Sequence, residues 1–133
     1  MSIGVLDHVS IPVRDIKRSG AFYDAVLAVL GLYRTGGGGD AIGYGTDPDV
    51  PCSFWILEQT GANAAMPGLG LHISFSAFDR AQVHAFHAAA LAHGGRDAGQ
   101  PGPRPQYSSG FYGAFVFDPD DTKIEAVVRK DLI

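Results

Sequence analysis

The sequence predicts an α+β protein built from two similar units, and three observations lead to this expectation. A chain of 133 residues favours one compact domain with a sizeable core. Hydrophobic residues make up 46% of it, and 18 glycines indicate many turns and short elements. Strand and helix patterns also occur twice in the same order. We therefore expect one domain, residues 1–133, with modules of about 1–64 and about 65–133.

The two modules share a repeat without a gap. Residues 8–31 align with residues 72–95, and nine positions are identical. Three of these are alanines in alanine-rich segments and carry little weight. The others include a strand histidine, a helix N-cap, a core phenylalanine and a terminal glycine, which are His8/His72, Asp15/Asp79, Phe22/Phe86 and Gly31/Gly95. Because each unit alone is too small to bury its apolar face well, we expect a shared core.

The first module is expected to contain one strand, one helix and three further strands. Residues 6–13 alternate between apolar and polar side chains, which is typical of a strand. Apolar residues at helical spacing predict a helix over 16–30, with Asp15 as N-cap and Gly31 after its end. Short strands are expected at 32–35, 41–45 and 53–58, with a glycine turn at 36–39.

The second module repeats this order after a small-residue linker at 61–68. A strand at 69–77 is followed by the N-cap candidate Asp79 and a helix over 80–93. Residues 99–105 are rich in glycine and proline and are expected to form a loop. Strands follow at 111–117 and 122–129, separated by a turn at 118–121.

Composition excludes several classes of function. Ten basic residues against 14 acidic ones give a net charge of −4, so nothing favours binding to nucleic acid. No apolar run approaches the roughly 20 residues of a membrane helix, and no secretory signal is visible. The single cysteine, Cys52, fits a reducing compartment, and we expect a cytoplasmic protein. We interpret Cys52 as a structural residue.

The repeat singles out His8 and His72 among the five histidines. They occupy equivalent positions on equivalent strands, and a pseudo-twofold axis between the modules could bring both rings into one cavity. Histidine is the commonest ligand of transition metals. Glu125 lies in the apolar last strand, where a carboxylate needs a cation or strong hydrogen bonds. Two histidines and one carboxylate would form a facial metal site with open positions.

The chain resembles the vicinal oxygen chelate superfamily, which includes glyoxalase I, bleomycin resistance proteins and extradiol dioxygenases. The resemblance rests on residues 7–13, on 71–73 and above all on the Asp-Pro-Asp turn at 118–120 followed by Ile124 and Glu125. It implies two βαβββ modules whose mixed, curled sheets surround a central cavity. It also implies a divalent metal, Fe(II), Mn(II), Zn(II) or Ni(II), held by His8, His72 and Glu125.

The sequence departs from metal-binding glyoxalase I enzymes at one position. Those enzymes carry a fourth ligand, a glutamate on the last strand of the first module. When Asp47-Pro48-Asp49 is aligned with the second Asp-Pro-Asp turn, Phe54 lies opposite Glu125, with Trp55 next to it. Neither side chain binds a metal, and Glu58 lies too late in the strand. This departure favours a three-ligand site.

Several other residues are candidates for contact with a substrate. One of Phe54 and Trp55 is expected to face the cavity and stack on a planar ligand. Tyr107, Ser108 and Tyr112 are expected near the cavity mouth, with Tyr107 as a hydrogen-bonding or acid residue. Arg104 could meet an anionic substrate or lie in solvent. We interpret the histidines of the second helix, which are His84, His87 and His93, as surface or rim residues.

Two functions of different classes remain open. The first is a small metal-dependent enzyme with glyoxalase-like lyase or ring-cleaving dioxygenase chemistry, in which Glu125 and Tyr107 act on a small molecule. The second is a metal-free drug-binding protein of the bleomycin-resistance type. The resemblance also makes a homodimer plausible, and the site could form within one chain or across two.

Overall fold

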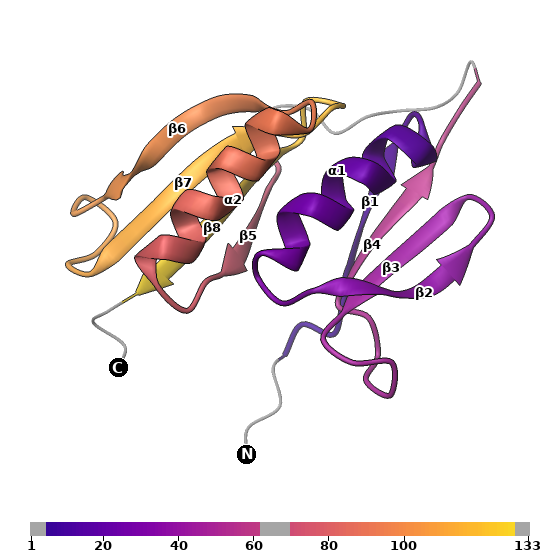
Figure 1. Cartoon of the computed structure of the whole chain (residues 1–133), viewed down its shortest axis with the longest axis horizontal. Coiled ribbons are helices and arrows are strands. Elements are labelled where there is room, and N and C mark those ends of the chain that lie inside the picture. Colours follow the sequence, from indigo (N-terminus) through magenta and orange to yellow (C-terminus); the bar gives the residue numbers. More distant parts are fainter. Residues whose placement is uncertain (1–4, 62–69, 130–133) are drawn as a thin grey trace.

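The protein folds into two four-stranded sheets that lie side by side, each covered on one face by a helix (Figure 1). The structure is a computed structural model that describes residues 5–61 and 70–129. The elements of the first module are β1 (Val9–Val13), α1 (Ile16–Ala28), β2 (Tyr33–Gly38), β3 (Ala41–Gly45) and β4 (Phe54–Glu58). Those of the second are β5 (His72–Ser76), α2 (Arg80–Ala92), β6 (Arg96–Pro103), β7 (Phe111–Phe117) and β8 (Lys123–Arg129).

The two modules have the same topology, as the repeat predicts. The strand orders are β1-β4-β3-β2 and β5-β8-β7-β6. In each sheet the first strand pairs in parallel with the last strand of its module, and the remaining pairs are antiparallel. The chain is therefore an α+β protein with two βαβββ modules and mixed sheets.

Matching residues begin and end the two helices. The carboxylate of Asp15 accepts hydrogen bonds from the first backbone N–H groups of α1, and Asp79 does the same for α2. Gly31 and Gly94 follow the helices with φ angles of +83° and +98°, where a side chain would clash with the backbone. The predicted caps are thus confirmed, and the second glycine stop lies at the first residue of the Gly94-Gly95 pair.

The two modules share one apolar core. Phe22 of α1 and Phe86 of α2 are both fully buried and belong to one cluster that also includes residues of both sheets. Each fully buried aromatic or branched side chain stabilises the fold by about 1.5–3 kcal/mol. Neither module buries this surface alone, which explains why they pack together. No helix in the described residues is long and apolar enough to span a membrane.

Two segments differ from the sequence-based expectation. Residues 96–103, expected in large part as a loop, form β6, an irregular edge strand whose pairing with β7 is interrupted twice. An edge strand tolerates proline because its outer N–H groups need no partner in the sheet. The expected glycine turn at 36–39 is shorter, since three of its glycines extend β2. The expected linker lies almost entirely outside the described residues.

The pairing register corrects the expected counterpart of Glu125. Ser74 of β5 lies opposite Glu125, and the equivalent Ser10 of β1 lies opposite Trp55. Trp55, and not Phe54, therefore occupies the matching position. The alignment of the two Asp-Pro-Asp turns fails by one residue because Trp55 lies eight residues after Asp47, whereas Glu125 lies seven residues after Asp118.

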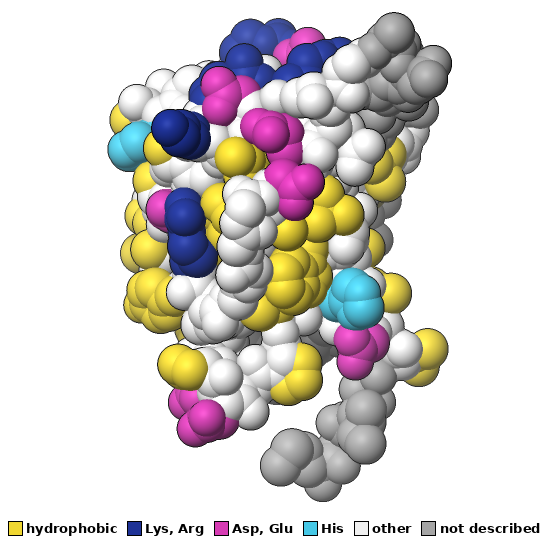
Figure 2. All heavy atoms as spheres, turned by 90° about the vertical axis from the view of Figure 1, so that its right-hand side faces the viewer, with side chains coloured by type: hydrophobic (Ala, Val, Ile, Leu, Met, Phe, Trp, Pro, Cys, Tyr) yellow, Lys and Arg dark blue, Asp and Glu magenta, His cyan; other side chains and the backbone are white. Residues whose placement is uncertain are grey.

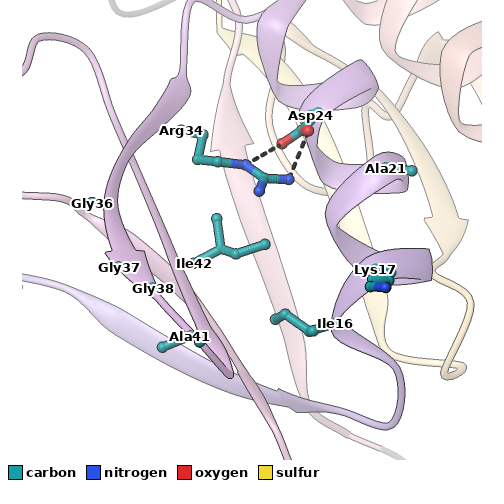
Figure 3. A pocket seen from close by; sticks show the side chains of 11 residues that line it. Ile16, Lys17, Ala21, Asp24, Arg34, Gly36, Gly37, Gly38, Ala41 and Ile42 are labelled. Carbon is teal, nitrogen blue, oxygen red and sulfur yellow. Dashed lines mark hydrogen bonds and ion pairs between the residues drawn. The ribbon is translucent and has the colours of Figure 1, made fainter.

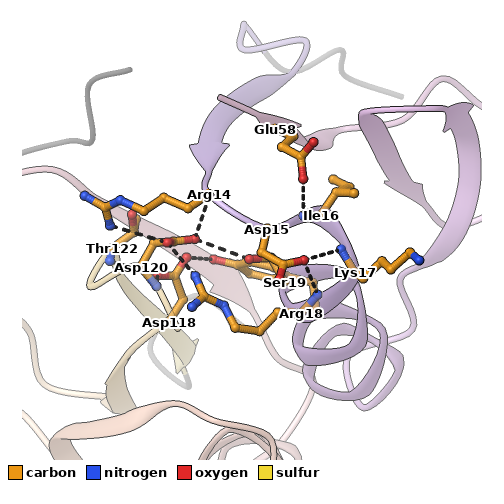
Figure 4. A network of polar contacts seen from close by, with 11 residues as sticks. Arg14, Asp15, Ile16, Lys17, Arg18, Ser19, Glu58, Asp118, Asp120 and Thr122 are labelled. Atoms are coloured by element: carbon orange, nitrogen blue, oxygen red, sulfur yellow. Dashed lines mark hydrogen bonds and ion pairs between the residues drawn. The ribbon is translucent and has the colours of Figure 1, made fainter. Parts of the chain in front are cut away.

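A polar network ties the start of α1 to the turn before β8 (Figure 4). The buried carboxylate of Asp120 accepts hydrogen bonds from the Arg18 guanidinium at 2.7 Å, the Ser19 hydroxyl at 3.3 Å and the backbone N–H of Arg14 at 3.2 Å. These bonds connect residues about a hundred positions apart and fix the two modules relative to each other.

Candidate functional site

His72 and Glu125 form a pair on the face of the second sheet that lies opposite α2. The His72 Nε2 atom lies 3.0 Å from Glu125 Oε1. Strands β5 and β8 run in parallel with Ser74 opposite Glu125, so His72, two residues before Ser74, points to the same side of the sheet. The expected association of these two residues is therefore present in the fold.

Glu125 is nearly buried, at 4% exposure, yet one of its oxygens is left without a partner. Its Oε2 atom has no hydrogen bond within the described residues. A buried carboxylate oxygen without a donor is unfavourable by about 1–3 kcal/mol, and such groups are rare in folded proteins. The side chain of His72 is half-exposed, so the pair has one buried and one accessible member.

The free oxygen lies near a glycine of the neighbouring strand. A Cβ atom added at Gly113 of β7 would lie 3.7 Å from Glu125 Oε2. Phe115, directly opposite Glu125 in the register, forms the next part of the wall, and its ring centroid lies 6.4 Å from that of His72. Glu125 and His72 thus lie beside Gly113 and an aromatic ring.

A cavity of about 310 Å³ lies over this pair. Besides His72 and Glu125 it is lined by aromatic and basic side chains, which are Tyr107, Phe111, Phe115, Lys123 and Arg129. His72 also borders a second, larger cavity of about 540 Å³, whose walls come from both modules and include Val9, Phe54, Phe75 and Phe78. His72 therefore stands between the two cavities.

His8 does not join the pair in this structure. Its Nδ1 atom lies 2.6 Å from Asp7 Oδ1, and its side chain is 52% exposed just before β1. No group of three histidine, cysteine or acidic side chains placed to hold a metal occurs in residues 5–61 and 70–129. Within one chain, the structure thus brings together His72 and Glu125 of the three expected ligands.

The pair itself fits a divalent cation. An imidazole nitrogen and a carboxylate are suitable ligands for Fe, Mn, Zn or Ni, and the free Oε2 of Glu125 lacks the positive partner that a buried carboxylate requires. His72 and Glu125 are therefore the described residues that could hold a metal.

The expected substrate residues of the second module lie on two different faces of its sheet. Tyr107 lines the smaller cavity, where its ring packs 5.1 Å from Phe111, and the Ser108 hydroxyl accepts a hydrogen bond of 3.4 Å from Arg129. Tyr112 lies on the other face of β7, in a cluster with α2, and its hydroxyl is 2.6 Å from His84 Nε2. It does not meet Glu125.

The two neighbouring aromatic residues of β4 point to opposite faces. Phe54 is 2% exposed in the core, where it reaches the edge of the larger cavity. Trp55 is half-buried on the other face and lies against Gly43 and Gly36, where added Cβ atoms would be 2.8 and 3.4 Å from its ring. Figure 2 shows hydrophobic side chains gathered on the side of the molecule that carries the hairpin of these glycines.

Other candidates have structural partners. Glu58 accepts a hydrogen bond from the backbone N–H of Ile16 and so supports the start of α1. The Arg104 guanidinium donates to backbone carbonyls of β6, including Gln100 O at 2.6 Å. His87 is buried and lies 2.8 Å from Asp97, so the expectation of a surface or rim residue is wrong for this histidine.

Sequence reasoning missed the basic residues of the site. Lys123 and Arg129 lie two residues before and four residues after Glu125 on the same strand, so their side chains share its face. Strand alternation alone could have identified them once Glu125 was chosen. The walls Phe111 and Phe115 follow from the antiparallel register of β7 with β8, which the sequence does not specify in advance.

A separate groove of about 430 Å³ runs between α1 and the β2–β3 hairpin (Figure 3). The Arg34 guanidinium donates two hydrogen bonds to the Asp24 carboxylate, at 3.2 and 2.8 Å, and Lys17 is the third charged residue of the lining. Among the described residues, no histidine lines this groove. We therefore place the candidate site at His72 and Glu125.

Comparisons with known proteins agree with the fold. A family model described as the Glyoxalase/Bleomycin resistance protein/Dioxygenase superfamily matches residues 5–126. A glyoxalase/bleomycin resistance protein from Albidiferax ferrireducens T118 is 33% identical in sequence. Its structure superposes with a TM-score of 0.84 over 95% of this chain and 100% of that one. No match was found among the curated proteins.

Two further solved structures share this architecture. A putative glyoxalase from Bacillus halodurans is 25% identical, with a TM-score of 0.69 over 93% of this chain and 95% of that one. A glyoxalase I mutant from Zea mays is 22% identical, with a TM-score of 0.67 over 90% of this chain and 45% of that one. The similarity to the Zea mays structure concerns the fold alone.

Proposed function

Because the chain belongs to the Glyoxalase/Bleomycin resistance protein/Dioxygenase superfamily, we propose that it is a small metal-dependent enzyme whose site is built on His72 and Glu125. The observation that carries this proposal is the buried Oε2 atom of Glu125, which lacks a hydrogen-bond partner within the described residues. A divalent cation would satisfy this oxygen, and the neighbouring His72 nitrogen would complete two of its ligand positions.

The third ligand in this proposal is His8 from a second copy of the chain. His8 is half-exposed before β1, so its ring is accessible to a partner. The larger cavity beside His72 is bordered by the exposed side chains of Leu6 and Phe78, which are 75% and 84% accessible. A second copy that covers these apolar side chains could also bring its own His8 to the site.

The reaction class is lyase or dioxygenase chemistry on a small molecule with two adjacent oxygens. A bound divalent metal supplies Lewis-acid polarisation of these oxygens. Phe115 and Phe111 exclude water from one side of the reacting group, since both are nearly buried in the cavity wall. Tyr107 lies at the exposed rim, where its hydroxyl can donate a hydrogen bond or a proton to the substrate.

Metal analysis of the purified chain tests the site. We expect a stoichiometric divalent transition metal that is lost in His72→Ala and Glu125→Gln and retained in His93→Ala, a control at an exposed helix end. The identity of the metal then guides a screen of catechols, hemithioacetals and fosfomycin. If no transition metal binds, and none changes the melting temperature, the metalloenzyme proposal is wrong.

A mixing experiment tests the shared site. His8→Ala and His72→Ala chains each lack one ligand, so neither variant alone should bind metal. If a site uses His8 of one copy and His72 of the other, random exchange restores about one metal for every four chains. Absence of restoration, with exchange verified by mass labelling, would assign His8 to its own chain or exclude it from the site.

A metal-free binding protein is the second candidate function. It is favoured by the absence of a complete three-ligand group within the described part of one chain, together with the apolar cavity of about 540 Å³. In that case an apolar ligand would bind equally well before and after chelation of metals, and His72→Ala would have little effect on its affinity.

A further inference from the structure

We propose that the cavity over Glu125 selects organic anions with a flat apolar body, such as aromatic carboxylates. The inference deepens the proposed function, because it assigns a substrate class to the same site. The inference rests on the cavity wall and not on the metal ligands, so it can be tested separately from the proposed metal site.

Two basic side chains enter the cavity from the strand that carries Glu125. Lys123 and Arg129 both lie on the Glu125 face of β8 and line the cavity. The Lys123 Nζ atom lies 4.9 Å from the centroid of the Phe115 ring, and Arg129 Cζ lies 4.8 Å from that of Phe111. Each cation is thus held over an aromatic ring, an attractive arrangement that leaves its N–H groups available.

These two cations lack the carboxylate partner that each of four arginines elsewhere has, which are Arg14, Arg18, Arg34 and Arg96. Elsewhere Arg18 pairs with Asp120, and Arg34 with Asp24. Within the described residues, no carboxylate lies within 4.0 Å of the charged nitrogens of Lys123 or Arg129. The hydrogen bond that Arg129 makes goes to the uncharged hydroxyl of Ser108, at 3.4 Å.

The charge of the cavity is therefore opposite to that of the molecule. The chain carries a net charge of −4, but this cavity holds two unpaired cations and a single carboxylate, Glu125, one oxygen of which lies beside His72. Nearly buried rings beneath the cations lower the local dielectric response, which strengthens attraction for an anion. An anionic group near Lys123 and Arg129 would gain charge-assisted hydrogen bonds.

The remaining walls fit the rest of such a ligand. Phe111 and Phe115 are 6% and 7% exposed, and the ring of Tyr107 stands at the rim against Phe111. Aromatic walls favour a flat apolar body by stacking and by burial of apolar surface. An aromatic acid could therefore place its carboxylate at the basic residues and its opposite end at His72 and Glu125.

A matched pair of probes tests this selectivity. 3,4-Dihydroxybenzoate and 3,4-dihydroxybenzamide have nearly the same shape but differ in charge. Calorimetric titration of the chelator-treated protein at low salt should give about tenfold tighter binding of the acid, because only the acid forms charge-assisted bonds. The preference should shrink as salt is added.

Variants locate the preference. The Lys123→Met/Arg129→Met double variant should bind the acid and the amide with the same affinity, whereas Lys17→Met, on α1, should keep the tenfold difference. Circular dichroism and melting curves establish that each variant is folded. The single Lys123→Met variant is a milder change, and it should reduce the affinity ratio of acid to amide by about half on a logarithmic scale.

The outcomes separate this inference from the metal proposal. Equal binding of acid and amide by the wild-type chain, or a preference that survives in the folded double variant, would overturn the inference even if metal binds stoichiometrically. A preference that is lost in the double variant supports the inference, and it does so even if no metal is found, in which case the proposed enzyme function is the part that fails.

Discussion

The hydroxyl of Tyr23, on α1, donates a hydrogen bond of 2.6 Å to the carboxylate of Asp118, in the turn before β8. Both groups are buried, and the bond connects the two modules. The other oxygen of Asp118 accepts from the backbone N–H groups of Asp120 and Thr122, at 2.8 and 2.9 Å. One carboxylate thus shapes the turn of the second module and holds the helix of the first.

Replacing Tyr23 by Phe should destabilise the protein by about 1–3 kcal/mol at neutral pH, because it leaves a buried carboxylate oxygen without its donor. Urea denaturation measures the free energy of unfolding. Tyr107→Phe is the matched control, since the hydroxyl it removes belongs to an exposed side chain. If the two variants have the same stability, the bond between the modules contributes nothing.

The same variant should change the response to alkaline pH. Burial, together with the nearby Asp118 carboxylate, holds the pKa of Tyr23 well above its ordinary value of 10.0. Stability from the protonated hydroxyl is therefore fully present below pH 10 and is lost as the pH rises above it. Wild-type protein should lose more unfolding free energy than Tyr23→Phe when the pH is raised beyond 10, as followed by circular dichroism.

Asp118→Asn should change how the stability of the protein responds to acidic pH. Burial raises the pKa of Asp118 above its ordinary value of 3.8. In the window above pH 3.8 the folded chain binds this proton more strongly than the unfolded chain, so stability from this group rises as the pH falls. The difference in unfolding free energy, wild type minus variant, should grow from pH 7 toward pH 4. A constant difference would contradict this prediction, and Asp40→Asn serves as the exposed control.

Glu125→Met should stabilise the metal-free protein while it abolishes metal binding. The change removes a buried carboxylate with an unpaired oxygen, and His72 stays accessible to water. We expect an increase of about 1–2 kcal/mol in the unfolding free energy measured in chelator. A loss of stability would mean that the His72 pair outweighs the burial of the charge.

Gly43→Ala should displace the single tryptophan of the chain. A methyl group at this position would lie 2.8 Å from the ring of Trp55, closer than side chains approach one another. We expect a loss of about 1–3 kcal/mol of stability and a shift of the tryptophan emission toward longer wavelength. Gly38→Ala is the control, because an added Cβ there meets nothing within 4 Å.

Local features of the fold could be predicted from the sequence with good accuracy. The caps Asp15 and Asp79 and the seventh strand were expected where the structure has them, because capping chemistry and apolar periodicity act within a few residues. Strand β6 was missed as an element because glycine and proline mask its pattern, although the family resemblance implied a fourth strand in this module.

The relation between the modules could not be predicted in the same way. The repeat makes His8 and His72 equivalent within their own modules, but it does not determine how one module packs on the other. That packing depends on the shape of the whole core, and it leaves His8 outside the His72–Glu125 pair, which forms within the second module. The register difference at Trp55 likewise depends on one extra residue between the Asp-Pro-Asp turn and this position, which residue types alone do not reveal.

The strand edges of the two sheets differ in their capacity for self-association. Among the four edge strands that the structure describes, β1 and β6 contain proline and β2 contains a run of glycines, features that discourage further strand pairing. Strand β5, His72–Ser76, contains neither residue type. Growth of a fibril by strand addition needs two receptive edges in each molecule. With one receptive edge among the described strands, strand addition would stop after a single pairing and could not build a fibril.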